Sequence, residues 1–171
     1  MFNQNKTNMN HFKFFRLLPV LAIFILPSCK PEATHEAVAE INMDSVKMKI
    51  QALESAFAAA SNKKDVDGVA AYYANDAQSM APMEPTRVGM DAIKAGIQKD
   101  MAGDTSGYTM SQVVTGVWGD GKYITETGTW SNTDKEGKVM RTGKFMTLFE
   151  LRDGNYKAIR DIWNSDSPPT K

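Results

Sequence analysis

Histidine is nearly absent from this chain. The 171 residues include two, and neither lies after residue 43. Histidine is the most common general acid or base in enzymes and a frequent zinc ligand. The sequence therefore excludes His-based catalytic dyads and His-based metal sites from residue 44 onward.

Cysteine is scarcer still, since Cys29 is the single one. One cysteine excludes a disulfide within the chain and argues against a Cys-based metal site. Glycine-rich phosphate loops are also missing, because Gly116, Gly119 and Gly121 surround an expected hairpin turn and do not precede a helix. We expect neither a metal nor a cofactor.

Acidic residues are missing from residues 1–28, which contain Lys6, Lys13 and Arg16. The remainder of the chain carries a net charge of −3. A mildly acidic chain gives no reason to expect nucleic-acid binding.

The basic start precedes an apolar run of 10 residues, 17–26. The last residue of this run begins the sequence Leu26-Pro27-Ser28-Cys29. Such a run is too short to span a bilayer and is typical of a signal peptide. Its end resembles the lipobox of bacterial lipoproteins. The sequence thus predicts a signal peptide over 1–28, a lipid on Cys29 and a location outside the cytoplasm at the bacterial envelope. Residues 29–43 are expected to be a tether, in which His35 is solvated.

Three helices are expected next. Asp44 can cap the first, whose apolar stripe has helical spacing. Glu54 lies off that stripe. The second helix is expected over Val66–Tyr73 with Asp65 as its N-cap, and the third begins at Gly89 and ends near Gly103. A short strand is expected over Gln78–Ala81. The stripe of the first helix consists of Val46, Ile50, Leu53, Phe57 and Ala60.

From residue 108 the pattern changes to the alternation of strands. Two strands, 108–118 and 122–132, precede a hairpin over Arg141–Asn164 that turns at Asp153-Gly154, the residues that a type I′ turn prefers. Strict alternation puts Tyr156 and Ala158 on one face of the last strand and Asp161 and Trp163 on the other. The result is an α+β domain over 44–165 with a four-strand antiparallel meander, followed by a tail over 166–171.

The chain resembles the SnoaL-like branch of the nuclear-transport-factor-2-like superfamily, also called ketosteroid-isomerase-like or the cone fold. The resemblance implies three helices packed on a strongly curved sheet, a pocket between them, and a homodimer formed through the convex sheet face. Apolar residues on both faces of the last hairpin agree with such a dimer. The residues that carry the resemblance are Asp65–Tyr73, Asn75–Ala77, Met80–Pro82, Val88–Gly89, Gly143–Phe145, Asp153–Gly154 and Arg160–Ser165.

Enzymes of this superfamily place acid and base residues inside the cone, so the resemblance makes carboxylates the candidates here. Asp161 beside Trp163 would be desolvated if its face lined the cone, and a raised pKa would suit a proton-transfer base. Alternatively, it pairs with a basic residue on the sheet surface, such as Arg160, Arg141 or Lys144. Glu126 could point inward, or be solvated or paired across strands.

Tyr72 and Tyr73 fall where a short helix would meet the pocket, and they serve either as ligand contacts or as core. The tryptophans and several methionines either line an apolar cavity or fill the core and the dimer interface. The full set of candidate ligand-binding residues is Tyr72, Tyr73, Met80, Trp118, Trp130, Phe145, Asp161, Trp163 and Asn164.

Three functional classes remain open on these residues. The first is a lipid-anchored module that binds a small apolar or amphipathic molecule, or acts as an accessory dimer. The second is a cofactor-independent isomerase or related acid/base enzyme, in which Asp161 acts with Tyr72 or Tyr73. The third is a dimerisation module whose cavity is only packing.

Overall fold

The computed structural model describes residues 41–166, so the expected signal peptide, Cys29 and most of the tether lie outside the described residues. Helices precede most of the strands, as in an α+β fold. In chain order the elements are α1 (Met43–Asn62), α2 (Val66–Ala70), β1 (Tyr73–Met80), β2 (Arg87–Val88), α3 (Met90–Gly103), β3 (Thr109–Gly119), β4 (Tyr123–Thr133), β5 (Val139–Arg152) and β6 (Asn155–Ser165).

The strands form one six-stranded sheet in the order β2-β1-β6-β5-β4-β3. Strands β3 to β6 are the expected antiparallel meander. Strand β1 pairs with β6 in parallel, so the sheet is mixed at this side. The parallel pair is possible because α3 and the meander separate β1 from β6 in sequence.

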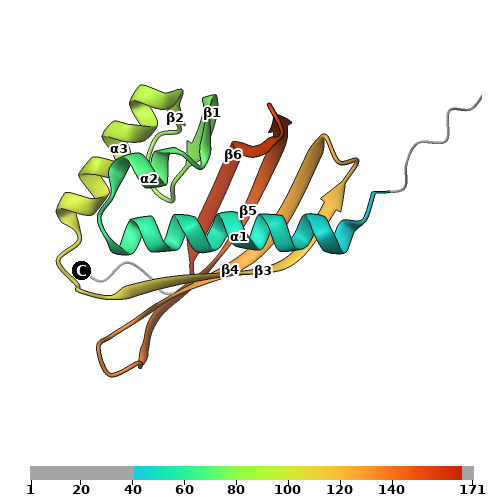
Figure 1. Cartoon of the computed structure of the whole chain (residues 1–171). Helices are drawn as coiled ribbons and strands as arrows, with labels where there is room; N and C mark the ends of the chain where they lie inside the picture. The colour runs from blue at the N-terminus through green and yellow to red at the C-terminus, as the bar shows by residue number, and fades with distance from the viewer. Residues whose placement is uncertain (1–40, 167–171) are drawn as a thin grey trace, which may run out of the picture. The chain divides into compact units, whose positions relative to one another are not determined.

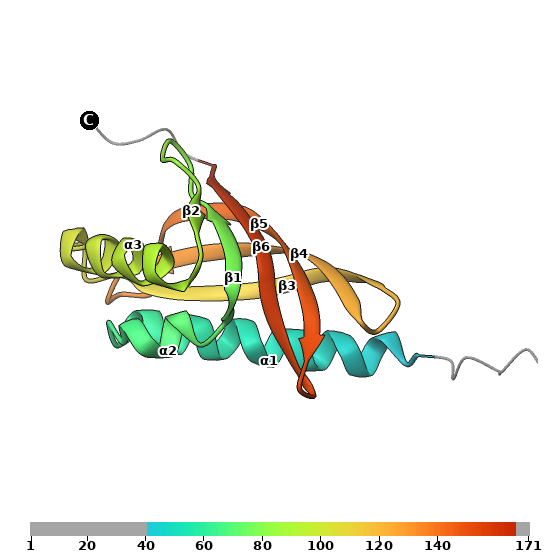
Figure 2. The same cartoon turned by 90° about the horizontal axis from the view of Figure 1, so that it is seen from above.

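Helix α1 lies across the concave face of the sheet (Figure 1). Helices α2 and α3 lie toward the β1–β2 side, and Figure 2 shows α3 beside these two strands. The core therefore forms between α1 and the meander, with Ile50, Ile124 and Phe149 fully buried. Within residues 41–166, no helix is both long and apolar enough to cross a bilayer.

Local signals explain the helix boundaries. The side chain of Asn42 caps α1 by accepting from the Ser45 N–H at 2.9 Å, so the prediction that Asp44 is the cap was wrong. Asp44 lies in the first turn, where a negative charge still favours the helix dipole. Asp65 caps α2 as predicted, accepting from the Gly68 N–H at 2.9 Å.

The second helix is shorter than expected, and the strand after it is longer. Helix α2 ends at Ala70, and Tyr73 already begins β1. Pairing with β6 draws the segment from Tyr73 to Gln78 into the sheet, so the strand begins where the helix was predicted to end and well before Gln78. Tertiary hydrogen bonding thus overrides the local helical pattern.

The last strand departs from strict alternation. Leu148 of β5 faces Arg160, whereas the next residue, Phe149, faces Ala158, which leaves Ile159 as an extra residue in β6. Such a bulge shifts the alternation by one position. As a result Tyr156, Ala158 and Asp161 are all buried, and the prediction that Asp161 lies on the opposite face from the first two was wrong.

Candidate functional site

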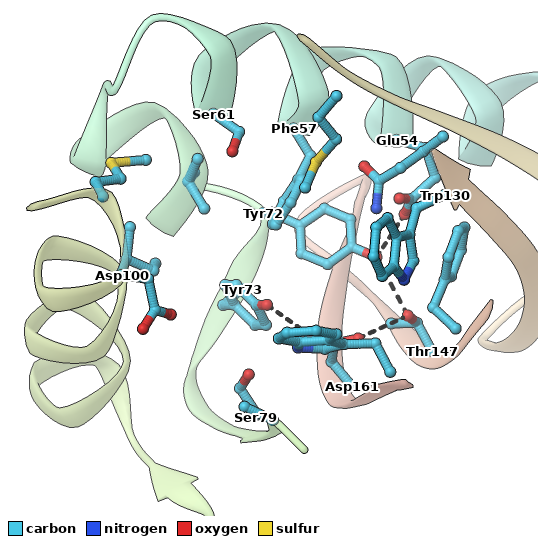
Figure 3. Close-up of a pocket in the computed structure, with 18 of the residues that line it drawn as sticks. Glu54, Phe57, Ser61, Tyr72, Tyr73, Ser79, Asp100, Trp130, Thr147 and Asp161 are labelled. Atoms are coloured by element: carbon cyan, nitrogen blue, oxygen red, sulfur yellow. Dashed lines mark hydrogen bonds between the residues drawn. The ribbon is translucent and has the colours of Figure 1, made fainter. Parts of the chain in front are cut away.

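A cavity of about 340 Å³ lies between the helices and the inner face of the sheet. Its lining comes from α1, α3, β1, the meander and the connections between them. Figure 3 shows Phe57 and Glu54 of α1 reaching toward side chains of the sheet. Clefts and cavities of this size, with a largely apolar lining and a few polar groups, are the usual form of small-molecule sites.

One end of the cavity, here called the acid end, is lined by Glu54, Tyr72, Tyr73, Thr147 and Asp161. These residues come from α1, the turn before β1 together with its first residue, β5 and β6, so the tertiary fold alone brings them together. Figure 3 shows Glu54, Tyr72, Thr147 and Asp161 pointing toward one another.

Two phenols bind two carboxyls at the acid end. The Tyr72 hydroxyl donates to Glu54 Oε1 at 2.5 Å, and the Tyr73 hydroxyl donates to Asp161 Oδ2 at 2.7 Å. Burial and the neighbouring carboxyls raise the pKa of both tyrosines well above 10, so both phenols stay protonated. They are therefore permanent hydrogen-bond donors at this site.

Asp161 is surrounded by donors. Besides Tyr73, the Thr147 hydroxyl donates to Asp161 Oδ1 at 3.2 Å, and Ser79 lies within hydrogen-bonding range. Burial raises the pKa of Asp161 above its ordinary 3.8, and these hydroxyl groups oppose that rise by stabilising the carboxylate. Asp161 is thus a desolvated carboxylate held in one orientation.

A third carboxyl, that of Glu126, lies within hydrogen-bonding range of Glu54. Glu126 of β4 is fully buried, and its Oε1 lies 3.3 Å from the Tyr72 hydroxyl. Burial raises the pKa of Glu54 to about 7, and burial together with the neighbouring Glu54 charge raises the pKa of Glu126 further. Two carboxylates at hydrogen-bonding range cannot both ionise easily, so the pair holds at least one proton at neutral pH.

Aromatic side chains form the walls. The rings of Trp130 and Trp163 meet edge to face, with centroids 6.2 Å apart. Phe57 and Tyr72 meet in the same way at 5.0 Å. All four rings and Phe145 line the cavity.

Two glycines allow these walls to form. Gly128 lies directly opposite Phe145, and a Cβ on Gly128 would lie 2.1 Å from the Phe145 ring. Gly143 lies opposite Trp130, and a Cβ there would meet both the Trp130 ring and the Asn164 carbonyl. The Trp130 indole N–H donates to that carbonyl at 2.9 Å, which leaves the ring faces for packing.

Charged residues surround the cavity where it reaches solvent. Arg87 is paired with Glu84 at 2.7 Å and with Asp100 at 2.8 Å. Lys64 donates to the carbonyl oxygen of Asp104 at 2.7 Å. These contacts hold Arg87 and Lys64 in place at the rim, each with partners of its own.

A family model described as SnoaL-like domain matches residues 55–159. The chain belongs to the SnoaL-like domain family. A comparison with curated proteins found no match.

Solved structures share the fold of this SnoaL-like domain. A ketosteroid isomerase-like protein from Erwinia carotovora atroseptica is 22% identical with a TM-score of 0.61, covering 75% of this chain and 100% of that one. A Nostoc punctiforme protein of unknown function with a cystatin-like fold is 15% identical with a TM-score of 0.65, covering 74% and 93%. An NTF-2-like protein from Shewanella oneidensis is 18% identical with a TM-score of 0.58, covering 68% and 96%. The predicted cone fold is confirmed.

The structure brings together six of the predicted ligand-binding residues around the SnoaL-like cavity. They are Tyr72, Tyr73, Trp130, Phe145, Asp161 and Trp163. Met80 and Asn164 do not line the cavity; the Asn164 side chain accepts from the Lys144 N–H at 3.1 Å. Trp118 lies away from it, with 58% of its surface exposed and its ring over Gly116.

Asp161 is buried and does not pair with a basic residue on the sheet surface, which was the alternative prediction. Lys144 pairs with Asp166, and Arg160 donates to the Ile159 carbonyl. Arg141 lines the exposed part of the cavity.

Sequence reasoning missed Glu54 and Thr147. Glu54 was placed off the apolar stripe of the first helix, which was wrong, because it is 1% exposed. Helical spacing could have revealed the burial of Glu54, because it lies four positions after Ile50. The buried residues of α1 are four positions apart: Val46, Ile50, Glu54 and Ala58. Thr147 alternates with Phe145 and Phe149 and is fully buried with them.

Within residues 41–166, no group of three or more His, Cys, Asp or Glu side chains has the arrangement of a metal site. The groups that the site does present are desolvated carboxyls, permanently protonated phenols and aromatic surface.

Proposed function

We propose that this SnoaL-like domain binds a small, mainly apolar molecule that carries one polar group. The observation that supports this most directly is the cavity itself, with aromatic walls and a polar acid end. The walls suit an apolar body, and the acid end suits a polar group that would otherwise be buried without a partner. Packing alone does not require buried carboxyls.

Native mass spectrometry of the protein purified from its own host tests this proposal. We expect a bound small molecule in the wild type. Trp163→Ala should reduce its occupancy because a wall is removed, while Trp118→Ala, outside the cavity, should leave it unchanged. Occupancy that falls equally in both variants would contradict a site in the cavity.

A second candidate is an acid/base enzyme that uses Asp161, and the three hydroxyl groups that orient this carboxylate favour it. A general base has to reach its proton and be held in place. If Asp161 is such a base, Asp161→Asn should lower the rate on an enolisable ketone by roughly 100-fold or more, the usual size of a general-base contribution. Binding of the ketone should change little.

The enzyme hypothesis needs turnover in the wild type. Steady-state kinetics with a series of small ketones measures it, and near-ultraviolet circular dichroism checks that Asp161→Asn keeps the fold. Absence of turnover with a ketone that demonstrably occupies the cavity would remove this candidate.

We further propose that the protein is a lipid-anchored homodimer of the bacterial envelope. The sequence ending in Ser28-Cys29 supports the anchor. Exposed apolar residues on the outer face of the sheet support the dimer, with Val113 56%, Met146 50% and Ile162 49% exposed. Contiguous apolar patches on soluble proteins commonly mark interaction sites.

A further inference from the structure

The acid end of the cavity carries carboxyls without basic partners. Glu54 and Asp161 line it, and Glu126 lies directly behind Glu54. Among residues 41–166, no lysine or arginine forms an ion pair or hydrogen bond with any of the three. A buried carboxylate without a positive partner is costly, so proteins normally pair it or bind a cation beside it.

One oxygen in this group has no partner at all. Glu126 is fully buried, and within the described part of the chain its Oε2 accepts no hydrogen bond. Burial, with a further contribution from the neighbouring Glu54 charge, raises the pKa of Glu126 to about 10, so Glu126 is protonated at neutral pH and adds no negative charge. The negative charge of the acid end therefore comes from Glu54 and Asp161, and a cation beside them would offset it.

The walls offer a second, independent feature that suits a positive charge. Trp130 and Trp163 lie nearly perpendicular, at 83°, and Phe57, Tyr72 and Tyr73 meet one another edge to face. Perpendicular rings present ring faces on more than one side of a space. Ammonium groups bind to such aromatic faces through the ring quadrupole, most strongly where water is excluded.

We propose that the cavity takes an organic cation, an ammonium group carried on a mainly apolar body. This inference rests on the proposed binding function and specifies the ligand class of the same site. The ammonium lies at the acid end, within reach of Asp161 and Glu54 and beside the rings of Tyr72 and Tyr73, and the apolar body lies along the tryptophan walls. An anionic head group would instead meet carboxyls that no basic side chain offsets.

The rim does not carry excess positive charge. Arg87 is held by Glu84 and Asp100, and Lys64 is held by carbonyl oxygens of the chain. The third basic side chain of the lining, Arg141, lies near enough to Asp104 to lower the pKa of that carboxyl. The volume of about 340 Å³ leaves room for a trimethylammonium group together with an apolar body.

The test compares two probes that differ in charge alone. Choline carries a trimethylammonium group, and 3,3-dimethylbutan-1-ol is its neutral carbon isostere. Each is titrated at pH 8 into the purified full-length protein, and two-dimensional NMR follows the three indole N–H signals. Trp130 and Trp163 report on the cavity, and the exposed Trp118 is an internal control.

We expect choline to bind roughly tenfold or more tightly than its isostere, as cation–π attraction plus a nearby carboxylate would give. Glu54→Gln and Asp161→Asn keep the side-chain shape and remove the charge, so each should weaken choline binding and leave the isostere unaffected. Asp44→Asn removes an exposed carboxylate on the same helix as Glu54 and should change neither affinity.

Equal binding of choline and the isostere by the wild type would overturn the inference, whether or not the variants fold. A third probe, the neutral N-phenyl-1-naphthylamine, separates the two proposals. If it shifts the Trp130 and Trp163 signals and choline does not, the binding function stands and the cation inference fails. If none of the probes shifts these two signals, both fail.

Discussion

A carboxyl group on the inner side of α1 determines much of the chemistry of this domain. Glu54 is 1% exposed and accepts a short hydrogen bond from Tyr72. Burial raises its pKa from 4.5 to about 7, although hydrogen bonding with Glu126 and Tyr72 opposes the rise. In the unfolded chain the same carboxyl is solvated and titrates at its ordinary pKa.

This difference predicts an unusual dependence of stability on pH. Between pH 4.5 and about 7 the unfolded chain loses the Glu54 proton while the folded domain keeps it, so stability falls as pH rises. Each such carboxyl contributes at most about 1.4 kcal/mol per pH unit. Urea unfolding at pH 5, 6 and 7 should show this decline.

Glu54→Gln should make the decline shallower, because glutamine does not titrate. Glu136→Gln, which changes an exposed glutamate, is the matched control and should keep the wild-type slope. A wild type whose stability rises from pH 5 to pH 7 would show that the acid end is hydrated and carries its charges freely.

At the scale of elements, irregularities in the strands build the cavity. The extra residue in β6, Ile159, turns Asp161 inward, because strict alternation after Ala158 would have left Asp161 on the outer face. Glycines opposite aromatic residues on β4 and β5 then provide space for the walls. Bulges and strand glycines commonly mark places where a sheet is shaped for function.

Gly128→Ala should therefore destabilise the domain. A Cβ at Gly128 would lie 2.1 Å from the Phe145 ring, and forcing that ring aside in a packed core costs roughly 1–3 kcal/mol. Gly103→Ala is the control, because a Cβ at Gly103 meets nothing within 4 Å. Thermal and urea unfolding compare the two. Equal stability of both variants would mean that Phe145 moves without cost.

At the scale of the whole molecule, the outer sheet face is expected to pair with a second copy. Met146 of β5 lies directly opposite Ile162 of β6, and both are about half exposed. Sedimentation at micromolar concentration should give a dimer. Ile162→Lys should shift the protein to monomer by burying an unpaired charge in the interface. A wild type that sediments as a monomer would contradict this.

The anchor is a separate expectation for the whole chain. Mass spectrometry of the membrane fraction should find a diacylglyceryl-modified peptide that begins at Cys29. Cys29→Ala should retain the unprocessed signal peptide, because the modified residue is missing. Recovery of an unmodified chain that begins elsewhere would refute the lipobox interpretation.

The sequence by itself determined the class of the domain. Helical spacing in the first half, alternation in the second, and turn residues such as Asp153-Gly154 are local signals, and they were enough to place α1, α3 and the four strands of the meander. The lack of histidine after residue 43 and the single cysteine limited the chemistry to carboxyls and phenols. These features need no knowledge of what lies nearby in space.

Only the tertiary structure decided which residues form the site. The parallel pairing of β1 with β6 converted an expected helix end into a strand, and the bulge at Ile159 reversed the face of Asp161. Glu54, Glu126 and Asp161 come from three elements far apart in the chain. Their shared burial, and hence their raised pKa values, depends on long-range packing against Tyr72 and its neighbours, which no local pattern of residues encodes.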